Sequence, residues 1–434
     1  MDNFIKDKFN KLIEYGHIDQ ELYEKYDVKR GLRNNNGTGV LVGLTKVADV
    51  EGYTMDGTNR VDSLGKLYYR GIEIKDFVNN AVGFSYEKTC FLLLFGYMPT
   101  ADELNQFKEM LADNYFLPAG FIDNIILKNP SKSLMNHITR CILSLYSFDD
   151  DPDSIEPLEF IKKGISIVAK MPAIISYSLQ AKTHYLDNDD LHIHAPKKEY
   201  SFAENILYLS RNDGRFTKLE AETLDMALVV HADHGGGNNS AFVGTVVAST
   251  LTDIYSMVAA SLTSLKGPRH GGANMAVLDM MAEVVNEVGY DASDDEIYNI
   301  CMKLLNKEFY DRKGLIYGIG HAIYSLSDPR CELLKEKAYE LAKDVNPKKF
   351  EFYTRFEEIA KRALYDKKKI KCCANVDFYS GLVYEMLDIP RDLFIPIFAA
   401  ARVVGWIAHD VETLLYSNKI VRPATKYVGK KGEK

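Results

Sequence analysis

Cysteines are scarce and scattered in this sequence. The chain of 434 residues contains six, and no two of them form a CxxC pair. They are Cys90, Cys141, Cys301, Cys331, Cys372 and Cys373. A disulfide scaffold needs a dense cysteine pattern in an oxidising compartment, whereas cytoplasmic proteins keep their thiols reduced. We therefore expect reduced thiols and a cytoplasmic protein.

Long apolar runs and an excess of positive charge are also missing. No run approaches the ~20 apolar residues that a transmembrane helix needs. The first residues, MDNFIKDKFNKLIEYGH, include early acidic side chains and no apolar core, unlike a secretory signal or an Arg-rich transit peptide. The net charge is −8, so we expect no general attraction to nucleic acid or to anionic membranes. Local arginines must then bind any anionic ligand against the field of the whole chain.

Strand patterns are few and lie in the first 71 residues. Residues 40–50 partly alternate between apolar and polar side chains, and residues 65–71 are typical of a short strand that ends in a turn. The rest of the chain has helical patterns, and S/T-x-x-E capping boxes at Thr100, Thr217 and Ser293 mark three helix starts. The sequence predicts an all-α protein with a minor N-terminal β-hairpin.

Two segments are apolar on nearly every side, residues 240–265 and residues 393–415. Helices of that kind are buried all round, so they predict a multilayer helical core. A more charged helical region runs from about residue 283 to residue 371 and lies between them. A chain of this length is long enough to form two domains. We predict a large helical domain from residues 1–278 and 385–434, and a small helical domain from residues 279–384.

Three histidine clusters beside glycines suggest a ligand site. They are HADHGGGNNS at residues 231–240, GPRHGGAN at residues 267–274 and GIGH at residues 318–321, the last followed by Asp-Pro-Arg. Glycine lets the backbone approach a ligand closely. One such histidine could equally be a hydrogen-bonded core residue, but three clusters favour a binding site. A metal site at His231 and His234 is a weaker alternative, because no cysteine ligands and no HExxH motif accompany them.

His270 precedes a helix that the pattern predicts over residues 273–288. The positive end of a helix disfavours the imidazolium ion and keeps the ring neutral. A neutral histidine in this position can donate a hydrogen bond to a developing enolate oxygen. The sequence therefore makes His270 a candidate for acid–base chemistry.

Three charged residues are further candidates for the site. Asp377, in NVDFYSG, is either a helix N-cap or a desolvated general base. Arg402 lies in an otherwise apolar helix, where a charge is costly unless it is paired. Arg422, in Val-Arg-Pro near the C-terminus, would by itself be an exposed surface arginine.

The sequence resembles the citrate synthase family of the si type. The resemblance rests on motifs that occur in the order and spacing of that family, namely HADHGGGNNSAF, GPRHGGAN, GIGHAIYSLSDPR and NVDFYSG. The 2-methylcitrate synthases are close relatives. The resemblance extends from residue 65 to residue 423 and implies an all-α homodimer whose small domain closes over the active site. It implies the condensation of acetyl-CoA with oxaloacetate and water to citrate and CoA. It implies no metal and no cofactor, because acetyl-CoA is a substrate.

The resemblance also implies residue roles. His270 would hydrogen-bond the acetyl carbonyl oxygen, Asp377 would remove a proton from the methyl group, and His321 would polarise the ketone of oxaloacetate. Oxaloacetate would be bound by His234, Asn238, Arg330 and Arg402. Arg422 would reach the site of the partner subunit. The backbone along CoA would be that of Leu315, Ile316, Gly318, Ile319 and Gly320.

The chain departs from the family pattern at two positions. Arg269 stands where leucine is common, and Ser325 stands where many members have an arginine or lysine that contacts a CoA phosphate. The lysines between residues 367 and 371 could supply that charge instead, although a run of charges is also typical of a solvated helix face.

Three alternatives to acetyl-CoA condensation stay open. A 2-methylcitrate synthase would use propionyl-CoA, and one extra methylene is worth only ~1–3 kcal/mol in a pocket. A non-catalytic relative would bind CoA or dicarboxylates without turnover, and a metal-binding protein is the third possibility. The complete set of His270, His321 and Asp377 favours an enzyme.

Overall fold

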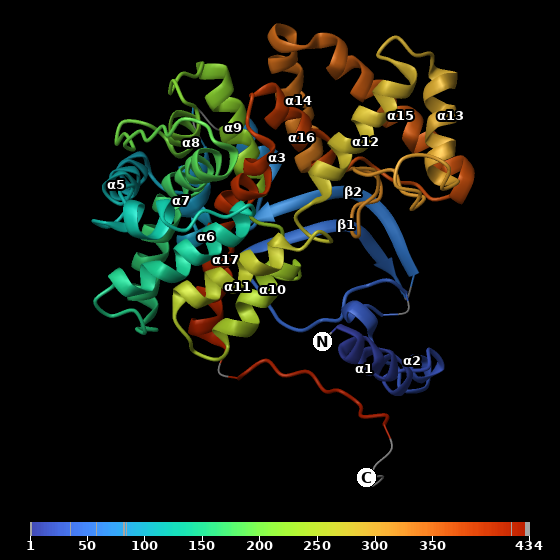
Figure 1. The fold of residues 1–434 in the computed structure, drawn as a ribbon, viewed down its shortest axis with the longest axis horizontal. Helices are drawn as coiled ribbons and strands as arrows, with labels where there is room; N and C mark the ends of the chain where they lie inside the picture. The colour runs from blue at the N-terminus through green and yellow to red at the C-terminus, as the bar shows by residue number, and fades with distance from the viewer. Residues whose placement is uncertain are drawn as a thin grey trace. The chain divides into compact units, whose positions relative to one another are not determined.

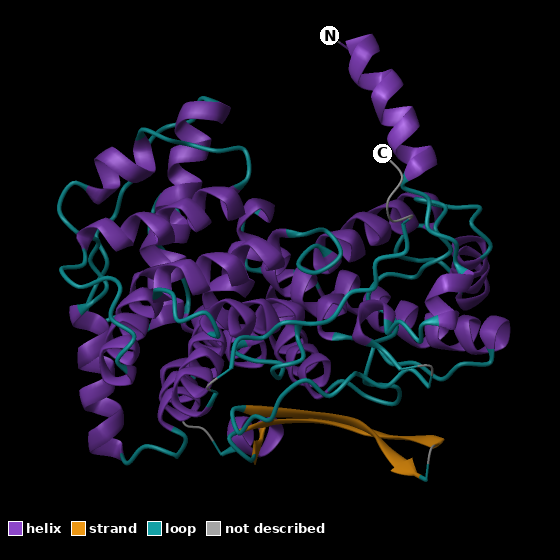
Figure 2. Cartoon of the chain, turned by 90° about the horizontal axis from the view of Figure 1, so that it is seen from below, coloured by secondary structure: helices purple, strands orange, loops and turns teal. Residues whose placement is uncertain are grey.

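The computed structural model describes residues 2–34, 36–57, 59–80, 83, 85–417 and 419–429 (Figure 1). These residues are mostly helical, with one small antiparallel sheet (Figure 2). The predicted all-α class with a minor N-terminal hairpin is confirmed. The chain divides into two compact units, residues 1–44 with 421–434, and residues 45–420. All six cysteines are free, in agreement with the expected reduced thiols.

The smaller unit contains α1 (Asp2–Tyr15), α2 (Glu21–Lys25) and a short helical turn, η1 (Arg30–Leu32). None of its described residues is buried. Large apolar side chains are instead exposed along α1, among them Phe4, Phe9 and Leu12. This unit therefore has no hydrophobic core of its own.

The larger unit begins with a sheet in the order β1-β2-β3. The strands are β1 (Ala48–Asp56), β2 (Asn59–Tyr69) and β3 (Ile72–Glu73), and both pairings are antiparallel. The expectation of a strand over residues 40–50 is wrong for residues 40–47, which are outside β1. The predicted strand at residues 65–71 forms only the end of β2, whose polar first half is held by pairing with β1 and has little hydrophobic pattern.

Helices make up the rest of the larger unit. The predicted capping boxes at Thr100, Thr217 and Ser293 all form, and a fourth at Ser201 starts α8. The helices are α3 (Ile74–Asn79), α4 (Tyr86–Phe95), α5 (Ala101–Asp113), α6 (Leu134–Leu145), α7 (Pro157–Asp187), α8 (Phe202–Ser210), α9 (Lys218–His231), α10 (Asn239–Ala248), α11 (Ile254–Lys266), α12 (Ala273–Val288), α13 (Asp294–Leu305), α14 (Pro329–Val345), α15 (Pro347–Lys368), α16 (Val376–Met386) and α17 (Phe394–Tyr416), with short turns η2 (Ile122–Leu127), η3 (Tyr146–Phe148) and η4 (Arg391–Leu393).

Helix α17 is the centre of the core. It packs against α4, α7, α9, α10 and α11, and it buries the only tryptophan, Trp406. In the described part of the chain, only the segment Arg391–Tyr416 has the length and apolar composition of a helix that could cross a membrane. However, 89% of the most apolar stretch of this segment is buried inside the protein. This is typical of a core helix, as the sequence predicted for residues 393–415.

The prediction of one fully buried helical segment over residues 240–265 is wrong. The segment forms two helices, because Leu251 adopts a positive φ of 63° and the side chain of Asp253 caps α11. Helix α10 buries only its small residues, and its larger apolar side chains stay partly exposed. These are Phe242, Val243, Val246 and Val247. The structure thus leaves an apolar face of α10 uncovered.

The charged region of the sequence forms its own group of helices. Figure 1 shows α12 to α16 gathered at one side of the larger unit and α5 to α8 at the other. Within the group, α14 packs on α15 and α16, and α13 packs on α15. Loops between these helices carry the third histidine cluster and the segment before Asp377.

Candidate active site

The first histidine cluster lies between the end of α9 and the start of α10. His231 is the last residue of α9, and its Nδ1 is 2.6 Å from the carbonyl oxygen of Ala227. Burial lowers the pKa of His231 to about 3. It therefore serves as a core residue. No group of three or more His, Cys, Asp or Glu side chains in the described part of the chain is placed to hold a metal ion. Asn238 is the N-cap of α10.

His234 and His321 come from different clusters but lie together. Their ring centroids are 5.3 Å apart, and Tyr324 stacks on His321 at 4.7 Å. Nε2 of the buried His234 has no hydrogen-bond partner among the described residues. Burial and then the nearby charge of Arg330 hold the pKa of His234 well below its usual value, so the ring is neutral.

The loop after His321 fixes its tautomer. The backbone N–H groups of Ile323 and Tyr324 both donate to Nδ1 of His321, each at 3.1 Å. A nitrogen that accepts hydrogen bonds carries no proton, so the proton of the neutral ring is on Nε2. Nε2 of His321 is therefore a hydrogen-bond donor.

Arg330 is buried and paired. Its Nε and Nη2 donate to the two carboxylate oxygens of Asp328 at 3.0 and 2.7 Å. Burial opposes the charge on both groups, but each partner stabilises the other, and the pKa of Asp328 is lowered. Asp328 also accepts the backbone N–H of Val376 at 3.1 Å, which ties this ion pair to the start of α16.

Arg402 is buried without such a partner. Its Nε donates to the carbonyl oxygen of His231 at 2.5 Å, but Nη1 and Nη2 have no hydrogen-bond partner among the described residues. Burial lowers the pKa of Arg402 to about 10, so the group is still charged at neutral pH. A buried cation with two unused donor groups is suited to an anionic ligand.

Asp377 is the second residue of α16, and the N-cap is Asn375, whose Oδ1 accepts the N–H of Asp377 at 3.0 Å. The interpretation of Asp377 as the N-cap is therefore wrong. Burial raises the pKa of its carboxyl to about 6, although the charges of Arg330 and Arg402 oppose the rise. A carboxyl with a pKa near neutrality is suited to general base catalysis.

A short antiparallel bridge holds the segment of Asp377 beside the loop of His321. Ile319 pairs with Ala374, and the N–H of Gly320 donates to Cys373 at 2.8 Å. Nδ2 of Asn375 donates to the carbonyl oxygen of Gly320 at 2.7 Å. A Cβ at Gly318 would lie 2.8 Å from the side chain of Phe378, so this close approach requires glycine.

His270 lies in a tight turn before α12, which spans the predicted residues. Its Nε2 is 3.1 Å from Oγ of Ser240. That hydroxyl accepts the indole N–H of Trp406 at 3.1 Å and donates to Oδ1 of Asn238 at 2.8 Å. Burial and the charge of Arg402 lower the pKa of His270 to about 4. The expected neutral ring is thus present, although burial rather than the helix end is its main cause.

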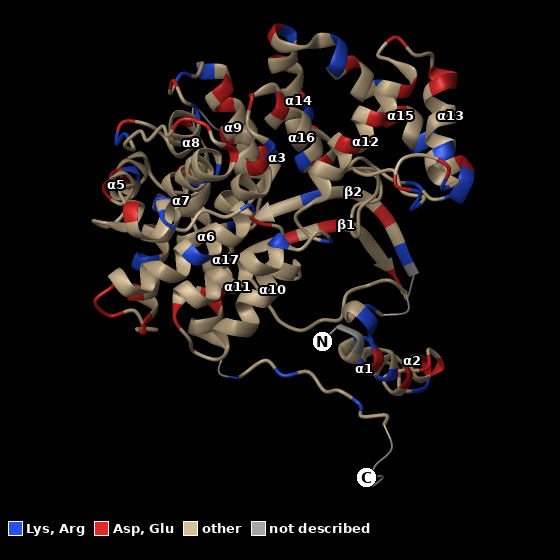
Figure 3. Cartoon of the chain, viewed as in Figure 1, with Lys and Arg blue, Asp and Glu red and all other residues tan. Residues whose placement is uncertain are grey.

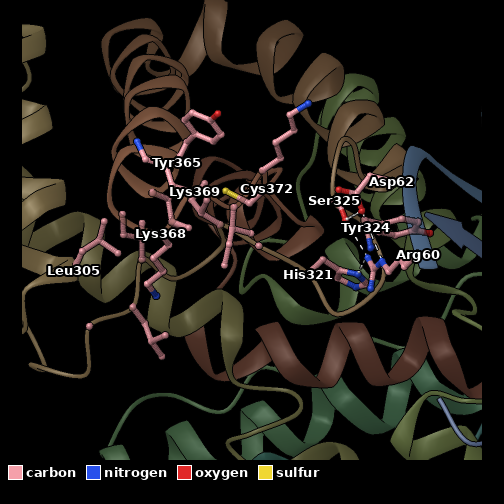
Figure 4. A pocket seen from close by; sticks show the side chains of 18 residues that line it. Arg60, Asp62, Leu305, His321, Tyr324, Ser325, Tyr365, Lys368, Lys369 and Cys372 are labelled. Carbon is pink, nitrogen blue, oxygen red and sulfur yellow. Dashed lines mark hydrogen bonds and ion pairs between the residues drawn. The ribbon is translucent and has the colours of Figure 1, made fainter. Parts of the chain in front are cut away.

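A cavity of about 830 Å³ opens beside His321. Of the five residues predicted to lie along CoA, Leu315, Ile316, Ile319 and Gly320 line it, and Gly318 does not. Lys368, Lys369 and Lys371 line it as well (Figure 4). Lys367 instead donates a hydrogen bond to Asn306. The cavity therefore joins a candidate catalytic histidine to a positively charged wall.

Some residues of the site were not found from the sequence. Ser240 and Trp406 position His270, and Asp328 pairs with Arg330. Only Asp328 has a local signal, because an N-cap aspartate followed by proline marks a helix start. Arg422 is exposed and belongs to the smaller unit.

Known proteins resemble this chain in sequence and in fold. A family model described as citrate synthase, C-terminal domain, matches residues 36–424. The citrate synthase of Haloferax volcanii is 33% identical over 410 residues, which cover 93% of this chain and 97% of that protein. The 2-methylcitrate synthase of Shewanella oneidensis is 31% identical over 363 residues, 84% of this chain and 88% of that protein.

A solved structure agrees with the sequence matches. It is the ternary complex of carboxymethyl coenzyme A and oxaloacetate with citrate synthase from Thermoplasma acidophilum. The TM-score is 0.75 at 27% identity, and the alignment covers 94% of this chain and 97% of that one. Because the family model spans most of the chain and the relatives align over nearly their full length, the chain belongs to the citrate synthase family.

Proposed function

We propose that the protein is a citrate (Si)-synthase, which converts acetyl-CoA, oxaloacetate and water into citrate and CoA. As a member of the family it is an acyltransferase that condenses an acyl-CoA with oxaloacetate. One observation carries the finer proposal. A carboxyl group with a pKa of about 6, Asp377, is bridged through its segment to the loop of His321, whose neutral ring presents Nε2–H as a donor.

The first step needs a base and an acid together. The methyl group of a thioester is a very weak carbon acid, so the enolate must be stabilised as the proton leaves. In this proposal Asp377 takes the proton and His270 donates a hydrogen bond to the carbonyl oxygen. In this structure the hydroxyl of Ser240 donates to Oδ1 of Asn238, so Nδ1 of His270 can serve as that donor only when the hydroxyl turns to donate to Nε2 of His270. Each group contributes ~10²–10⁴-fold.

The second step joins the enol to oxaloacetate. Nε2–H of His321 polarises the ketone, and the new carbon–carbon bond forms there. Arg402 offers two unused donor groups to a carboxylate, which supports its role as an oxaloacetate ligand. Arg330, His234 and Asn238 complete the proposed set. Water then hydrolyses citryl-CoA, and CoA leaves.

The two-domain prediction becomes part of this proposal. Arg60 and Asp62 belong to the proposed large domain of residues 1–278 and 385–434, whereas the other residues that line the cavity belong to residues 279–384. A cavity with walls from both domains supports closure of the small domain over the substrates. A smaller radius of gyration in solution scattering with oxaloacetate than without it is the expected result.

The pH dependence of the reaction follows from Asp377. The carboxyl must be ionised to accept a proton, so kcat/KM should fall tenfold per unit as the pH drops below about 6 and level off above it. His270, with a pKa of about 4, stays neutral over this range. A pH profile of CoA release measures this, and a profile that is flat between about pH 5 and pH 7 would contradict the role of Asp377.

Release of free thiol from acetyl-CoA tests the proposed reaction. Thiol should appear only when oxaloacetate is present, because condensation precedes hydrolysis. Binding of both ligands without thiol release would instead identify a non-catalytic relative. Citrate formed from carbon-labelled acetyl-CoA and cut by a stereospecific lyase reports the face of attack, and label in the position left by Re attack would exclude the Si assignment.

A 2-methylcitrate synthase is the second candidate. The observation in its favour is that a relative of that name is about as similar as the named citrate synthases. The two differ by one methylene in the acyl group, worth ~1–3 kcal/mol in a pocket. The ratio of kcat/KM for acetyl-CoA and propionyl-CoA distinguishes them. A ratio in favour of propionyl-CoA would replace the first proposal.

We also propose that the protein is a homodimer whose sites take Arg422 from the partner subunit. Helix α10 carries no charged residue and α11 only Lys266, so both are almost entirely tan in Figure 3. The apolar face of α10 and the exposed apolar side chains of α1 are suited to burial against a second copy.

Mixing two inactive variants tests the shared site. In a hybrid of Arg422→Ala and Asp377→Ala subunits, one site has both residues intact. Random exchange should therefore restore up to about a quarter of the sites. Activity is measured after the subunits are unfolded together and refolded. Proven hybrid formation without any recovery would count against the contribution of Arg422.

A further inference from the structure

Four cations line the cavity beside His321, and one of them is distant in sequence from the rest. Lys368, Lys369 and Lys371 come from the end of α15 and the loop after it, whereas Arg60 comes from β2. Asp62 is the only carboxylate among the described residues that line the cavity. The cavity is therefore positive in a chain whose net charge is −8, which suits a ligand with several negative charges.

Arg60 is held in place with part of its guanidinium unused. Its Nη2 donates to the carbonyl oxygen of Ile323 at 2.7 Å and to Oγ of Ser325 at 3.0 Å. The guanidinium lies over the ring of Tyr53, 4.3 Å from the centroid. Nε is 3.7 Å from Asp62, and Nη1 makes no hydrogen bond to any described residue. With 24% of the side chain exposed, Arg60 can add a ligand without moving.

Ser325 links Arg60 to the cavity. Its hydroxyl donates to Oδ1 of Asp62 at 2.8 Å and accepts from Nη2 of Arg60. Figure 4 shows Arg60, Asp62 and Ser325 together near His321, with Lys368 and Lys369 across the cavity. The guanidinium of Arg60 thus contacts residue 325 directly, and both residues line the cavity.

Close packing of β2 keeps Arg60 at this place. A Cβ at Gly65 would lie 2.1 Å from the backbone oxygen of Ser327, and the N–H of Gly65 donates to Oγ of Ser327 at 3.0 Å. The strand is therefore fixed against the loop that follows His321. The charge of Arg60 on β2 is therefore held as firmly as a charge on the loop after His321 would be.

We propose that Arg60 binds a phosphate group of the acyl-CoA substrate and takes the part of a basic residue at position 325. This inference rests on the proposed function, which makes an acyl-CoA the ligand. The fork of the guanidinium suits a phosphate, and Lys368, Lys369 and Lys371 supply further charge to the same polyanion. Arg60 is a binding residue and takes no part in proton transfer.

Arg60→Ala is the direct test. The KM for acetyl-CoA should rise about tenfold or more, as expected for the loss of a hydrogen bond between charged groups. kcat and the KM for oxaloacetate should change little. Arg355→Ala is a matched control, because Arg355, like Arg60, donates to a backbone oxygen and forms an ion pair with an aspartate, but does not line this cavity. Its partners are Ala292 and Asp294, at 2.7 Å each. It should leave the KM unchanged.

Two additions make the test specific. Arg60→Ala combined with Ser325→Arg should restore most of the lost affinity, because the charge returns to the same place. With 3′-dephospho-acetyl-CoA, the effect of Arg60→Ala should disappear if the 3′-phosphate is the ligand and persist if the diphosphate is. Arg60→Lys, which keeps the charge, gives an intermediate KM and serves if the alanine variant does not fold.

Three results would overturn the inference. The first is an unchanged KM for acetyl-CoA in Arg60→Ala. The second is a fall in kcat alone, which would mean that Arg60 only positions the loop of His321. The third is a KM of Arg60→Ala that Ser325→Arg does not lower. Failure of the wild-type protein to release CoA at all would instead overturn the proposed function, so the two failures are distinguishable.

Discussion

Alanine in place of Asp377 should lower kcat at least ~10²-fold while the fold stays intact. No other carboxyl group in the proposed mechanism can take the methyl proton. The cap of α16 is Asn375, which the substitution leaves in place. Burial already disfavours the charged form of Asp377, so its removal should not destabilise the fold. Steady-state release of CoA and thermal unfolding measure the two effects.

Asp295→Ala is the matched control for this variant. Asp295 is the second residue of α13, as Asp377 is the second residue of α16, but its side chain is exposed. Its loss removes the same interaction with a helix end, worth ~0.3–1 kcal/mol, and should leave kcat unchanged. Near wild-type turnover in Asp377→Ala would end the assignment of Asp377 as the base.

Methionine in place of Arg402 should abolish measurable oxaloacetate binding and, in the absence of ligand, raise the free energy of unfolding. Nη1 and Nη2 of Arg402 are buried and have no hydrogen-bond partner among the described residues. Because burial lowers the pKa of Arg402 to about 10, its charge is less favourable in the folded protein than in water. Removing it should stabilise the ligand-free protein by ~1–3 kcal/mol. Calorimetric titration and thermal unfolding measure both effects.

Arg330→Met should change stability in the opposite direction. Arg330 is paired with Asp328, so its removal leaves a buried carboxylate without its partner. Breaking such a pair costs ~3–5 kcal/mol.

Oxaloacetate should raise the melting temperature of the wild-type protein and leave that of Arg402→Met unchanged. A less stable Arg402→Met that still binds oxaloacetate would refute the role of this arginine as the ligand's counter-ion.

Local sequence signals located the helix starts well. The predicted helix over residues 273–288 is α12, and the three predicted capping boxes all form. These features depend on side chains within one turn of each other, so the sequence contains the whole interaction. The break between α10 and α11 was missed although Asp253 is also a local cap, because the apolar composition around it outweighed one residue.

Longer-range features needed the folded chain. The first half of β2 is polar and forms because it pairs with β1. The motifs predicted the residues of the candidate site, but their sequence could not show that Arg330 is paired and Arg402 is not, although both side chains are buried. It also could not show that His231 is a core residue while its neighbour His234 faces His321.

The sequence by itself determined the helical class, the candidate catalytic residues and the family, because these depend on local periodicity and on motifs within short segments. Only the tertiary structure decided which nitrogen of His321 carries the proton, which arginine lacks a partner, and that Arg60 stands beside Ser325, 265 residues away in the chain. Hydrogen-bond partners and burial set these properties, and both come from segments that only folding brings together.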